Sequence, residues 1–493
     1  MAKTLMILGT TSNAGKSLVT AGLCRILAQD GYKVAPFKAQ NMALNSFITE
    51  DGLEMGRAQV IQAEAAGLLP DVRMNPILLK PTTDRKSQVI VNGKVWKDLS
   101  AKDYYKEKKN IFPKALDSFY SLCDEYDIVI CEGAGSPSEI NLKEVDIVNM
   151  GFAKAVNAPA IIVGDIDRGG VFASLAGTIF LFDERERELT KGFLINKFRG
   201  DPSILEPGLV QLEEITKVPT LGVIPYLDVD IEEEDSLAEE LRKSERGGII
   251  DIGVIRLPHI SNFTDFHALS HYDEVNIRYI QKAKDFGDPD FLIIPGTKNT
   301  LDDLKWIRES GLDTMMKRHS QKKKPIFGIC GGYQILGEHL SDPYGVESGG
   351  EMKGLGLLPT KTIFSKEKTT RQTEGKLNTI PGYFSFMSNE SIKGYEIHMG
   401  HTSFDKGNIL GTTTYGDDGC VYHHIAGTYI HGFFDQGTIA KKLIEKLLED
   451  KGITKGEIKT FDYDVYKKEQ YDLLAKGLRN AINLKEIYNI LGI

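Results

Sequence analysis

The sequence has few cysteines, no long apolar run and no basic excess. Its five cysteines, among 493 residues, include no closely spaced pair, which argues against a disulfide framework or a zinc site. No apolar run approaches the roughly 20 residues that a membrane span needs. The start, MAKTLMILGTT, lacks the charged and apolar regions of a signal peptide. We expect a cytoplasmic protein with no membrane partner and no bound redox cofactor.

The charge balance argues against a nucleic-acid partner. The formal net charge is −9, and the most compact basic run, Lys322 to Lys324, precedes a strand-like segment and is interpreted as a solvated strand entrance. Apolar residues form 41% and charged residues 26% of the chain, which is typical of globular proteins. The composition gives no indication of the oligomeric state.

Short apolar runs alternate with helical patterns in both halves of the chain. This rhythm predicts an α/β fold with two doubly wound domains, in which ligands bind beyond the carboxyl ends of the strands. The charged stretch VDIEEEDSLAEELRKSERGG separates the halves. The predicted division is an N-terminal domain over 1–230, an acidic linker over 231–249, a second domain over 250–447 and a C-terminal helical extension over 448–493.

A phosphate-binding loop is predicted between Gly9 and Ser17. The loop follows a strand and opens a helix, so backbone N–H groups at Asn13, Ala14 and Gly15 can hold phosphates. Lys16 would meet the β and γ oxygens of ATP, and the Ser17 hydroxyl would bind Mg²⁺. Five residues, rather than four, separate the two loop glycines. A glycine-rich turn that only caps a helix is the alternative.

A cysteine nucleophile is predicted in GICGGYQ, at a turn from strand to helix. Cys330 lies between small residues that permit a strained turn, and a helix N-terminus favours the thiolate form of a cysteine. With TYIHGFF downstream, the segment resembles the class I glutamine amidotransferases. The resemblance implies that His431 is the base, and that Gly296 and Gly331 lie at the oxyanion and glutamine site. The glutamate that commonly follows this histidine is replaced by Phe433, so a Cys-His dyad and a triad completed from elsewhere both stay open.

The longer phosphate loop resembles that of dethiobiotin synthetase and the cobyric acid synthase group. The resemblance implies that Lys38 contacts ATP and that Glu132, in CEGAG, binds the metal. A carboxylate at a strand end also suits metal-assisted phosphoryl transfer. The alternative is that Glu132 is only an exposed acid before a glycine turn. The resemblance further implies a substrate loop that contains Gln40, Asn41 and Asn45. It also implies that Glu139 contacts the substrate and that Asn196 reads the adenine base.

Two interpretations remain open for several polar residues. Asp165 and Asp167 end a strand, so they either line the cleft or cap the next helix. His398 and His401 either shape the glutamine pocket or lie at a domain interface. His423 and His424 are interpreted as ordinary strand-edge residues, and Asn196 is equally compatible with simply closing its strand.

Motifs along nearly the whole chain resemble the cobyric acid synthase family. They include NMALNS, EMGRAQVIQAEA, EGAGSPSEINL, GDIDRGGVFAS, NKFRGD, GICGGYQILG and YEIHMG. The resemblance implies ATP- and glutamine-dependent amidation of four peripheral carboxylates (b, d, e and g) of adenosylcobyrinic acid a,c-diamide. The corrinoid is implied by the resemblance alone, whereas the residues predict only the two half-reactions.

Three alternatives remain. The a,c-diamide synthases carry acids in the loop where this chain has Asn41 and Asn45. A partitioning ATPase would have its signature lysine at the position of Thr11 and would need no glutaminase half. A non-enzymatic corrinoid-binding module would leave both loops unexplained.

Overall fold

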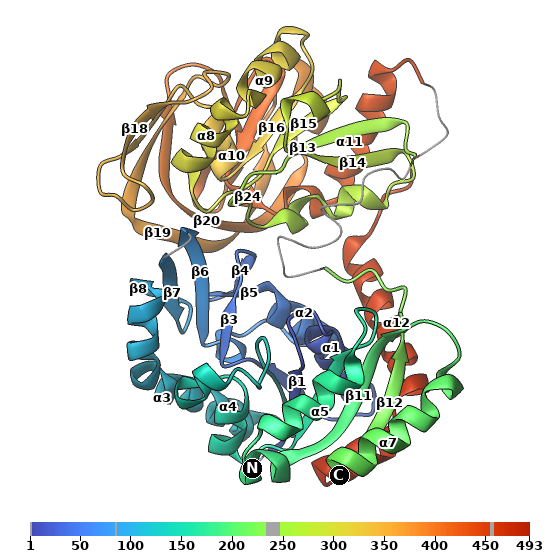
Figure 1. Cartoon of the computed structure of the whole chain (residues 1–493). Helices are drawn as coiled ribbons and strands as arrows, with labels where there is room; N and C mark the ends of the chain where they lie inside the picture. The colour runs from blue at the N-terminus through green and yellow to red at the C-terminus, as the bar shows by residue number, and fades with distance from the viewer. Residues whose placement is uncertain (1, 84–85, 233–246, 454–457) are drawn as a thin grey trace. The chain divides into compact units, whose positions relative to one another are not determined.

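A computed structural model describes residues 2–83, 86–232, 247–453 and 458–493. The chain forms two compact units (Figure 1). Unit 1 comprises Met1–Ala43, Glu54–Ile231 and Val465–Ile493, and unit 2 comprises Leu44–Leu53 and Glu232–Asp464. These units are discontinuous in sequence, whereas the predicted domains are continuous ranges, and those ranges stay a prediction. The central part of the predicted linker, 233–246, lies outside the described residues.

A parallel six-stranded sheet forms the centre of unit 1, in the order β12-β11-β10-β1-β9-β2. These strands are short, mostly buried apolar runs from the first half of the sequence, as expected for strands covered on both faces. The strands are β1 (Lys3–Gly9), β2 (Val34–Phe37), β9 (Ile128–Glu132), β10 (Ala160–Asp165), β11 (Thr190–Phe198) and β12 (Thr220–Pro225).

Helices from both ends of the chain complete the core of unit 1. Leu474 and Leu478 are buried in the same apolar cluster as Leu5, Ile7 and residues of the first helix. Both chain termini therefore lie in this unit (Figure 1). The helices are α1 (Lys16–Gln29), α2 (Arg57–Ala65), α3 (Ala101–Glu125), α4 (Met150–Val156), α5 (Val171–Leu181), α6 (Glu184–Leu189), α7 (Glu206–Thr216), α12 (Tyr463–Ala481) and α13 (Leu484–Leu491).

Unit 1 also holds a smaller sheet that the sequence did not predict. Its order is β3-β6-β7-β8, with β6 to β8 joined as antiparallel neighbours. These strands are short or half-polar, so they lack the continuous apolar runs that marked the main sheet. The strands are β3 (Gln40–Met42), β6 (Ile77–Thr83), β7 (Lys86–Val91) and β8 (Lys94–Ser100), and β5 (Glu54–Gly56) lies before α2.

Unit 2 is built on a sheet that is parallel on one side and antiparallel on the other. The parallel part has the order β14-β13-β15-β16-β23, and β22 and β21 extend it as antiparallel strands. This extension contains a long hairpin of β19 and β20, and beyond β19 the sheet continues with β17, which is parallel to β19, and then β18. The parallel strands are β13 (Ile250–Ile255), β14 (Val275–Ile280), β15 (Phe291–Ile294), β16 (Ile326–Ile329) and β23 (Ile425–Thr428).

The remaining elements of unit 2 cover and extend this sheet. The other strands are β17 (His339–Asp342), β18 (Gly350–Lys353), β19 (Thr360–Leu377), β20 (Ser391–Phe404), β21 (Asn408–Thr413), β22 (Gly416–Tyr422) and β24 (Ile430–His431). The helices are α8 (Thr300–Glu309), α9 (Leu312–Gln321), α10 (Gly331–Leu336) and α11 (Gly437–Asp450). The segment Leu44–Leu53, with strand β4 (Ser46–Ile48), packs on this unit although it precedes it in sequence.

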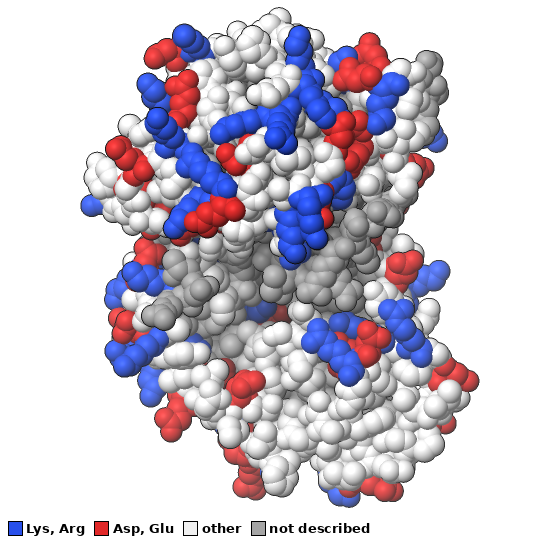
Figure 2. All heavy atoms as spheres, turned by 45° about the horizontal axis from the view of Figure 1, so that its top comes forward, with Lys and Arg blue, Asp and Glu red and all other residues white. Residues whose placement is uncertain are grey.

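The surface carries charges of both signs. On the face shown in Figure 2, Lys and Arg side chains lie among Asp and Glu side chains. In the basic run before β16, Lys322 and Lys324 both pair with Asp288, at 2.9 and 3.0 Å. Within the described parts of the chain, the helices are all too short or too polar to cross a membrane.

Candidate active site

The predicted phosphate loop joins β1 to α1 in unit 1. Gly15 has φ of 101° and precedes Lys16, the first residue of the helix. A Cβ atom at Gly15 would lie 2.0 Å from the Asn196 side-chain nitrogen, so only glycine fits there. The Lys16 ammonium donates to the carbonyl oxygens of Thr11 and Gly135, at 2.9 and 3.0 Å. Backbone carbonyls therefore hold the lysine over its own loop.

A buried carboxylate faces this loop from the end of β9. Glu132 is 1% exposed and accepts hydrogen bonds from the Ser17 hydroxyl at 2.8 Å and the Lys38 ammonium at 3.0 Å. Gln59 and Gln62, on α2, donate to its other oxygen at 3.4 and 2.5 Å. Burial alone would raise the pKa of Glu132, but Lys38 and these hydrogen bonds outweigh it and lower the pKa. The carboxylate is therefore charged.

The donor set at Glu132 fits a magnesium ion. A hydroxyl and a charged carboxylate lie side by side at the N-terminus of a helix that follows a glycine loop, and Mg²⁺ prefers such oxygen ligands. Sequence analysis identified Ser17, Lys38 and Glu132 but missed Gln59 and Gln62. The signal was their spacing in RAQVIQAEA, which places two amides on one face of α2.

The ends of two further strands reach the same loop. Asn196 donates to the Ala14 carbonyl at 3.0 Å, and Lys197 donates to the Asn13 carbonyl at 2.8 Å. Lys197 also pairs with Asp165 at 3.0 Å, so Asp165 lies within the cleft edge rather than only capping a helix. Parallel strands place their carboxyl ends at one edge, which explains why β10 and β11 meet the loop.

The structure divides the predicted substrate loop. Gln40 and Asn41 are buried in unit 1, where Tyr104 donates to the Gln40 side chain at 2.6 Å and Asn41 donates to Gln59 at 3.1 Å. Asn45 belongs to unit 2, where its side chain accepts a 3.4 Å hydrogen bond from the Phe263 backbone. The three residues are thus not brought together in a single compact unit.

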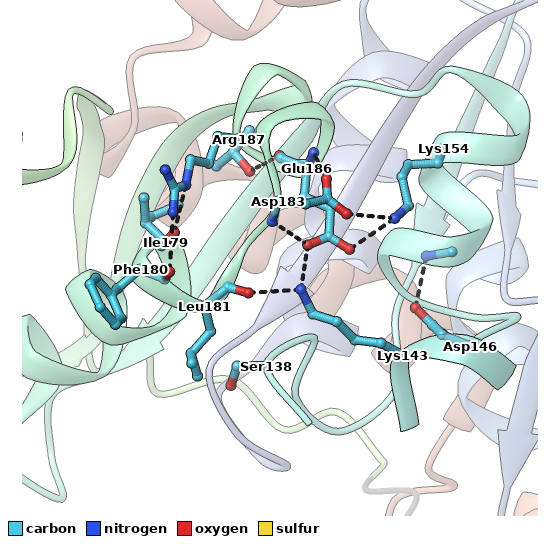
Figure 3. Close-up of polar contacts among 12 residues, drawn as sticks. Ser138, Lys143, Asp146, Lys154, Ile179, Phe180, Leu181, Asp183, Glu186 and Arg187 are labelled. Carbon is cyan, nitrogen blue, oxygen red and sulfur yellow. Dashed lines mark hydrogen bonds and ion pairs between the residues drawn. The ribbon is translucent and has the colours of Figure 1, made fainter. Parts of the chain in front are cut away.

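Glu139 is exposed in the loop that follows β9, just before a 3₁₀ turn over Ile140–Val145. Lys143, in this turn, donates to Glu186 and to the Leu181 carbonyl, each at 2.7 Å (Figure 3). Lys154 also reaches Glu186, at 3.0 Å. Glu186 therefore binds two lysines and anchors the loop, while Glu139 stays accessible to a ligand.

In unit 2, Cys330 occupies a strained turn between β16 and α10. Its φ of 50° and ψ of −110° are rare for a residue with a side chain. A Cβ at Gly332 would lie 2.0 Å from the Ile294 carbonyl oxygen, and one at Gly331 would lie 2.6 Å from Thr297 Cγ2. The flanking glycines are thus required for the turn to pack against the loop after β15.

His431 lies at the end of the sheet that carries this turn and is held by Asp265. Its Nδ1 lies 2.8 Å from an Asp265 carboxylate oxygen, and the other oxygen accepts the Gly432 N–H at 2.9 Å. Both side chains are buried, at 1% and 2% exposed. An acid 166 residues away therefore occupies the orienting position that Phe433 cannot fill.

Charge in this cluster favours the imidazolium form. Burial alone would lower the pKa of His431, but the Asp265 carboxylate and the Cys330 sulfur outweigh burial and raise the pKa to about 10. With Nδ1 bound to Asp265, Nε2 is the ring nitrogen left for the sulfur and a substrate. The expected oxyanion loop is adjacent, because a Cβ at Gly296 would lie 3.1 Å from His431 Cε1.

His398, on β20, is one of the other histidines singled out in the sequence. Its ring stacks on Tyr429 with centroids 3.8 Å apart, and it bonds Glu396 and the Gly400 carbonyl, at 3.1 and 3.0 Å. Glu396 in turn pairs with Arg371 through both oxygens, at 2.9 Å each. Both ring nitrogens of His398 are occupied, so His398 fits a supporting role better than that of a base.

Comparison with known proteins decides the family. Residues 5–237 match the CobQ/CobB/MinD/ParA nucleotide binding domain, and residues 251–439 match the CobB/CobQ-like glutamine amidotransferase domain. A protein of Lachnoclostridium phytofermentans named cobyric acid synthase is 55% identical over 100% of this chain and 99% of its own length. Proteins of that name from Ruminiclostridium cellulolyticum and Citrobacter koseri are 54% and 48% identical, covering 100% of this chain and 97% and 99% of their own lengths. The chain belongs to the cobyric acid synthase family.

Membership of the cobyric acid synthase family confirms the resemblance on which much of the sequence analysis rested. The chain combines a nucleotide-binding domain with a glutamine amidotransferase domain, and the two loops described above lie one in each matched range. Asp265 is the residue of this site that sequence reasoning missed. No local signal in the sequence marks it, because it meets His431 across 166 residues.

Proposed function

We propose that this chain converts adenosylcobyrinic acid a,c-diamide to adenosylcobyric acid by amidating its b, d, e and g carboxylates. ATP and glutamine are the co-substrates, Mg²⁺ assists, and the reaction takes place in the cytoplasm. One observation carries the proposal: proteins named cobyric acid synthase match this chain from end to end at about half identity. The side-chain geometry of the two loops supplies the chemistry of both half-reactions.

The phosphate loop would activate the carboxylate. A carboxylate oxygen attacks the γ-phosphorus of ATP, and the bond to the β-bridging oxygen breaks, leaving an acyl phosphate and ADP. Lys16, close to Gly135, is placed to move from carbonyl partners to phosphate oxygens. When bound, Mg²⁺ would be held by Ser17 and Glu132 and would neutralise phosphate charge. Lys38, Gln59 and Gln62 keep Glu132 charged and oriented.

The glutaminase half would supply ammonia through a Cys-His-Asp site. The Cys330 sulfur attacks the carboxamide carbon of glutamine, and backbone N–H groups of the Gly296 and Gly331 loops stabilise the oxyanion. The C–N bond breaks as His431 Nε2 gives its proton to the departing ammonia. Water then attacks the thioester, His431 takes its proton, and glutamate and the thiolate are released. Ammonia attacks the acyl phosphate, which releases phosphate and forms the amide.

The a,c-diamide synthases remain the rival in this family. They differ in which carboxylates are amidated, and acids in their loop replace the amides Asn41 and Asn45. The buried Asn41 side chain donates to Gln59, which an ionised carboxylate could not do, so this contact favours an amide at position 41. A partitioning ATPase does not account for the glutamine amidotransferase range.

The decisive experiment combines purified protein with ATP, Mg²⁺, glutamine and either adenosylcobyrinic acid or its a,c-diamide. Mass spectrometry counts the amides added. A gain of four amides on the a,c-diamide supports the proposal, and a gain of two on the unamidated acid, with none on the a,c-diamide, indicates the rival reaction. Intact glutaminase activity with no corrinoid product contradicts the proposal.

Two variants separate the half-reactions. Cys330→Ser is expected to abolish glutamine-dependent amidation while high ammonium at raised pH still supports it, because the synthetase site is unchanged. Lys16→Ala is expected to lose product with either nitrogen source but to retain a folded glutaminase. If ammonium fails to rescue folded Cys330→Ser, or Lys16→Ala keeps the wild-type rate, the assigned division of labour is wrong.

A further inference from the structure

The segment Leu44–Leu53 comes from the N-terminal half of the sequence but belongs to the compact glutaminase unit. Its strand β4 is tied to the long hairpin: Thr370 donates to the Gly52 carbonyl at 2.8 Å, and Gln372 donates to the Ile48 carbonyl. Ile48 is fully buried there. The segment is therefore a built-in part of unit 2 and is flanked on both sides by residues of unit 1.

The first contact with the catalytic groups runs through Tyr395. Its ring stacks on the His431 ring, with centroids 5.3 Å apart and planes 21° apart, and the Phe47 ring lies 5.1 Å from it. The Tyr395 hydroxyl donates to the Ser46 carbonyl at 3.1 Å and accepts from the Asn262 amide at 2.9 Å. The segment thus fixes both the hydroxyl and the ring that packs on the base.

The second and third contacts reach the other two catalytic groups. Ile48 and Ile397 lie in one buried apolar cluster with Tyr395, and the Ile397 carbonyl accepts a 3.5 Å hydrogen bond from the Cys330 sulfur. Asn45 accepts from the Phe263 backbone, in the short helix over Phe263–Phe266 that contains Asp265. The segment therefore touches the immediate support of the cysteine, the histidine and the aspartate.

We propose that Leu44–Leu53 positions the glutaminase site, with Tyr395 as the positioning residue for His431. The inference rests on the proposed roles of Cys330 and His431. Because the segment contacts the support of the cysteine, the histidine and the aspartate, its packing sets the geometry in which glutamine is hydrolysed.

The test measures glutaminase kcat and KM in two variants of the full chain. Tyr395→Phe removes the hydroxyl and keeps the stacked ring, and Ile48→Ala removes the packing of the segment. Both are expected to lower the glutaminase kcat roughly 10- to 100-fold, the scale set by a misplacement of about 1 Å, while KM for glutamine changes less than about twofold. The pH dependence of the rate at which iodoacetamide alkylates Cys330 should differ from that of the wild type. The rate of ammonium-dependent amidation should stay at the wild-type value.

Matched controls are Tyr422→Phe and Ile363→Ala, which remove the same groups at positions 37% and 56% exposed in unit 2. Wild-type kcat in both test variants overturns the inference. So does an equal loss of the glutamine and ammonium routes together with a lower melting temperature, since that marks a purely structural role. Cys330→Ser separates the two failures: activity in that variant refutes the site itself, whereas its inactivity beside fully active Tyr395→Phe and Ile48→Ala refutes only the positioning role.

Discussion

At the scale of single residues, Asp265 sets the protonation of the base. Its carboxylate opposes the burial of His431 and helps to raise the pKa of the imidazole to about 10, so the imidazolium persists at neutral pH and is lost as the pH rises through that value. The form that delivers a proton to ammonia is thus already present when glutamine binds. With a neutral side chain in place of Asp265, burial would be the dominant effect on the pKa of His431 and would lower it.

We predict that Asp265→Asn lowers glutaminase kcat by roughly 10²–10⁴-fold, the range associated with a positioned acid-base group. The alkaline limb of the pH profile should move below its wild-type position, because the His431 pKa falls without the carboxylate. Ammonium-dependent amidation at pH 8 to 9 serves as the control and should be unchanged. An unmoved alkaline limb would show that another group sets the His431 charge.

A second buried acid links pH to the stability of unit 2. Asp418 accepts hydrogen bonds from the Thr428 hydroxyl and from the Tyr429 N–H, the latter at 3.0 Å, and burial raises its pKa to about 7. The folded state therefore keeps a proton that the unfolded chain releases. The resulting stabilisation is full below about pH 4 and is lost as the pH rises to about 7.

We predict that Asp418→Asn removes this pH dependence, because an amide does not titrate: its oxygen can accept the Tyr429 N–H and its NH2 group can donate to the Thr428 hydroxyl. The wild type should lose on the order of a few kcal/mol of unfolding free energy between about pH 4 and 7 relative to the variant. Urea unfolding followed by Trp306 fluorescence in a Trp96→Phe background reports on unit 2, since the two tryptophans lie in different units. Parallel stability curves for the two proteins would contradict the prediction.

At the scale of elements, the turn from β16 to α10 requires its glycines. Gly332 packs against the backbone carbonyl groups of Ile294 and Pro295. These are backbone atoms, so they cannot move aside for a Cβ as a flexible side chain could. Gly332→Ala is expected to destabilise unit 2 by about 1–3 kcal/mol or more and to reduce glutaminase activity. Trp306 fluorescence and glutamine hydrolysis measure the two effects.

Gly177→Ala, in α5 of unit 1, makes the same chemical change where no atom lies within 4 Å of the new Cβ. It should be stabilising by about 0.5–1 kcal/mol, as is usual in a helix interior. Equal tolerance of both substitutions would mean that the turn relaxes more easily than its contacts suggest.

Elements with local signals were predicted well. The phosphate loop and the cysteine turn each combine a buried strand, small residues and a helix start within about fifteen positions, so the chain itself brings their groups together. The buried parallel strands were predictable for the same reason, since helices on both faces impose continuous apolar runs.

Features that depend on distant pairing could not be predicted. Asp265 meets His431 across 166 residues, and Ser46 meets Tyr395 across 349, and neither pair leaves a spacing in the sequence. The long strand β19 of unit 2 alternates buried and exposed residues over its first five positions and is largely half-buried or exposed after them, so it lacks the continuous apolar run that marks the parallel strands. The position of Asn45 apart from Gln40 follows from the same tertiary contacts.

At the scale of the whole molecule, the last helices of the chain support the first. On α1, a Cβ at Gly22 would lie 2.2 Å from a Leu478 methyl group, Arg25 pairs with Asp472 at 2.8 Å, and Asp30 pairs with Arg479 at 2.7 Å. The helix that begins with Lys16 and Ser17, the proposed ATP- and Mg²⁺-binding residues, is thus packed against α12.

We predict that deleting residues 465–493 abolishes ATP binding and amidation by unfolding unit 1, because its apolar core loses a whole layer. Trp96 fluorescence in a Trp306→Phe background should report the unfolding, and isothermal titration should report the loss of nucleotide binding. Glutaminase activity should survive in the truncated chain. Wild-type nucleotide affinity after the deletion would show that α12 and α13 are dispensable.

The return of the chain to its starting unit also fixes an order of assembly during translation. A domain folds once all of its segments have left the ribosome. Residues 1–231 emerge first, yet their core stays open until α12 and α13 appear, whereas unit 2 is complete in sequence by Asp464. We therefore expect the proposed nucleotide site to be completed last, after the proposed glutaminase site, so that a prematurely terminated chain hydrolyses no ATP.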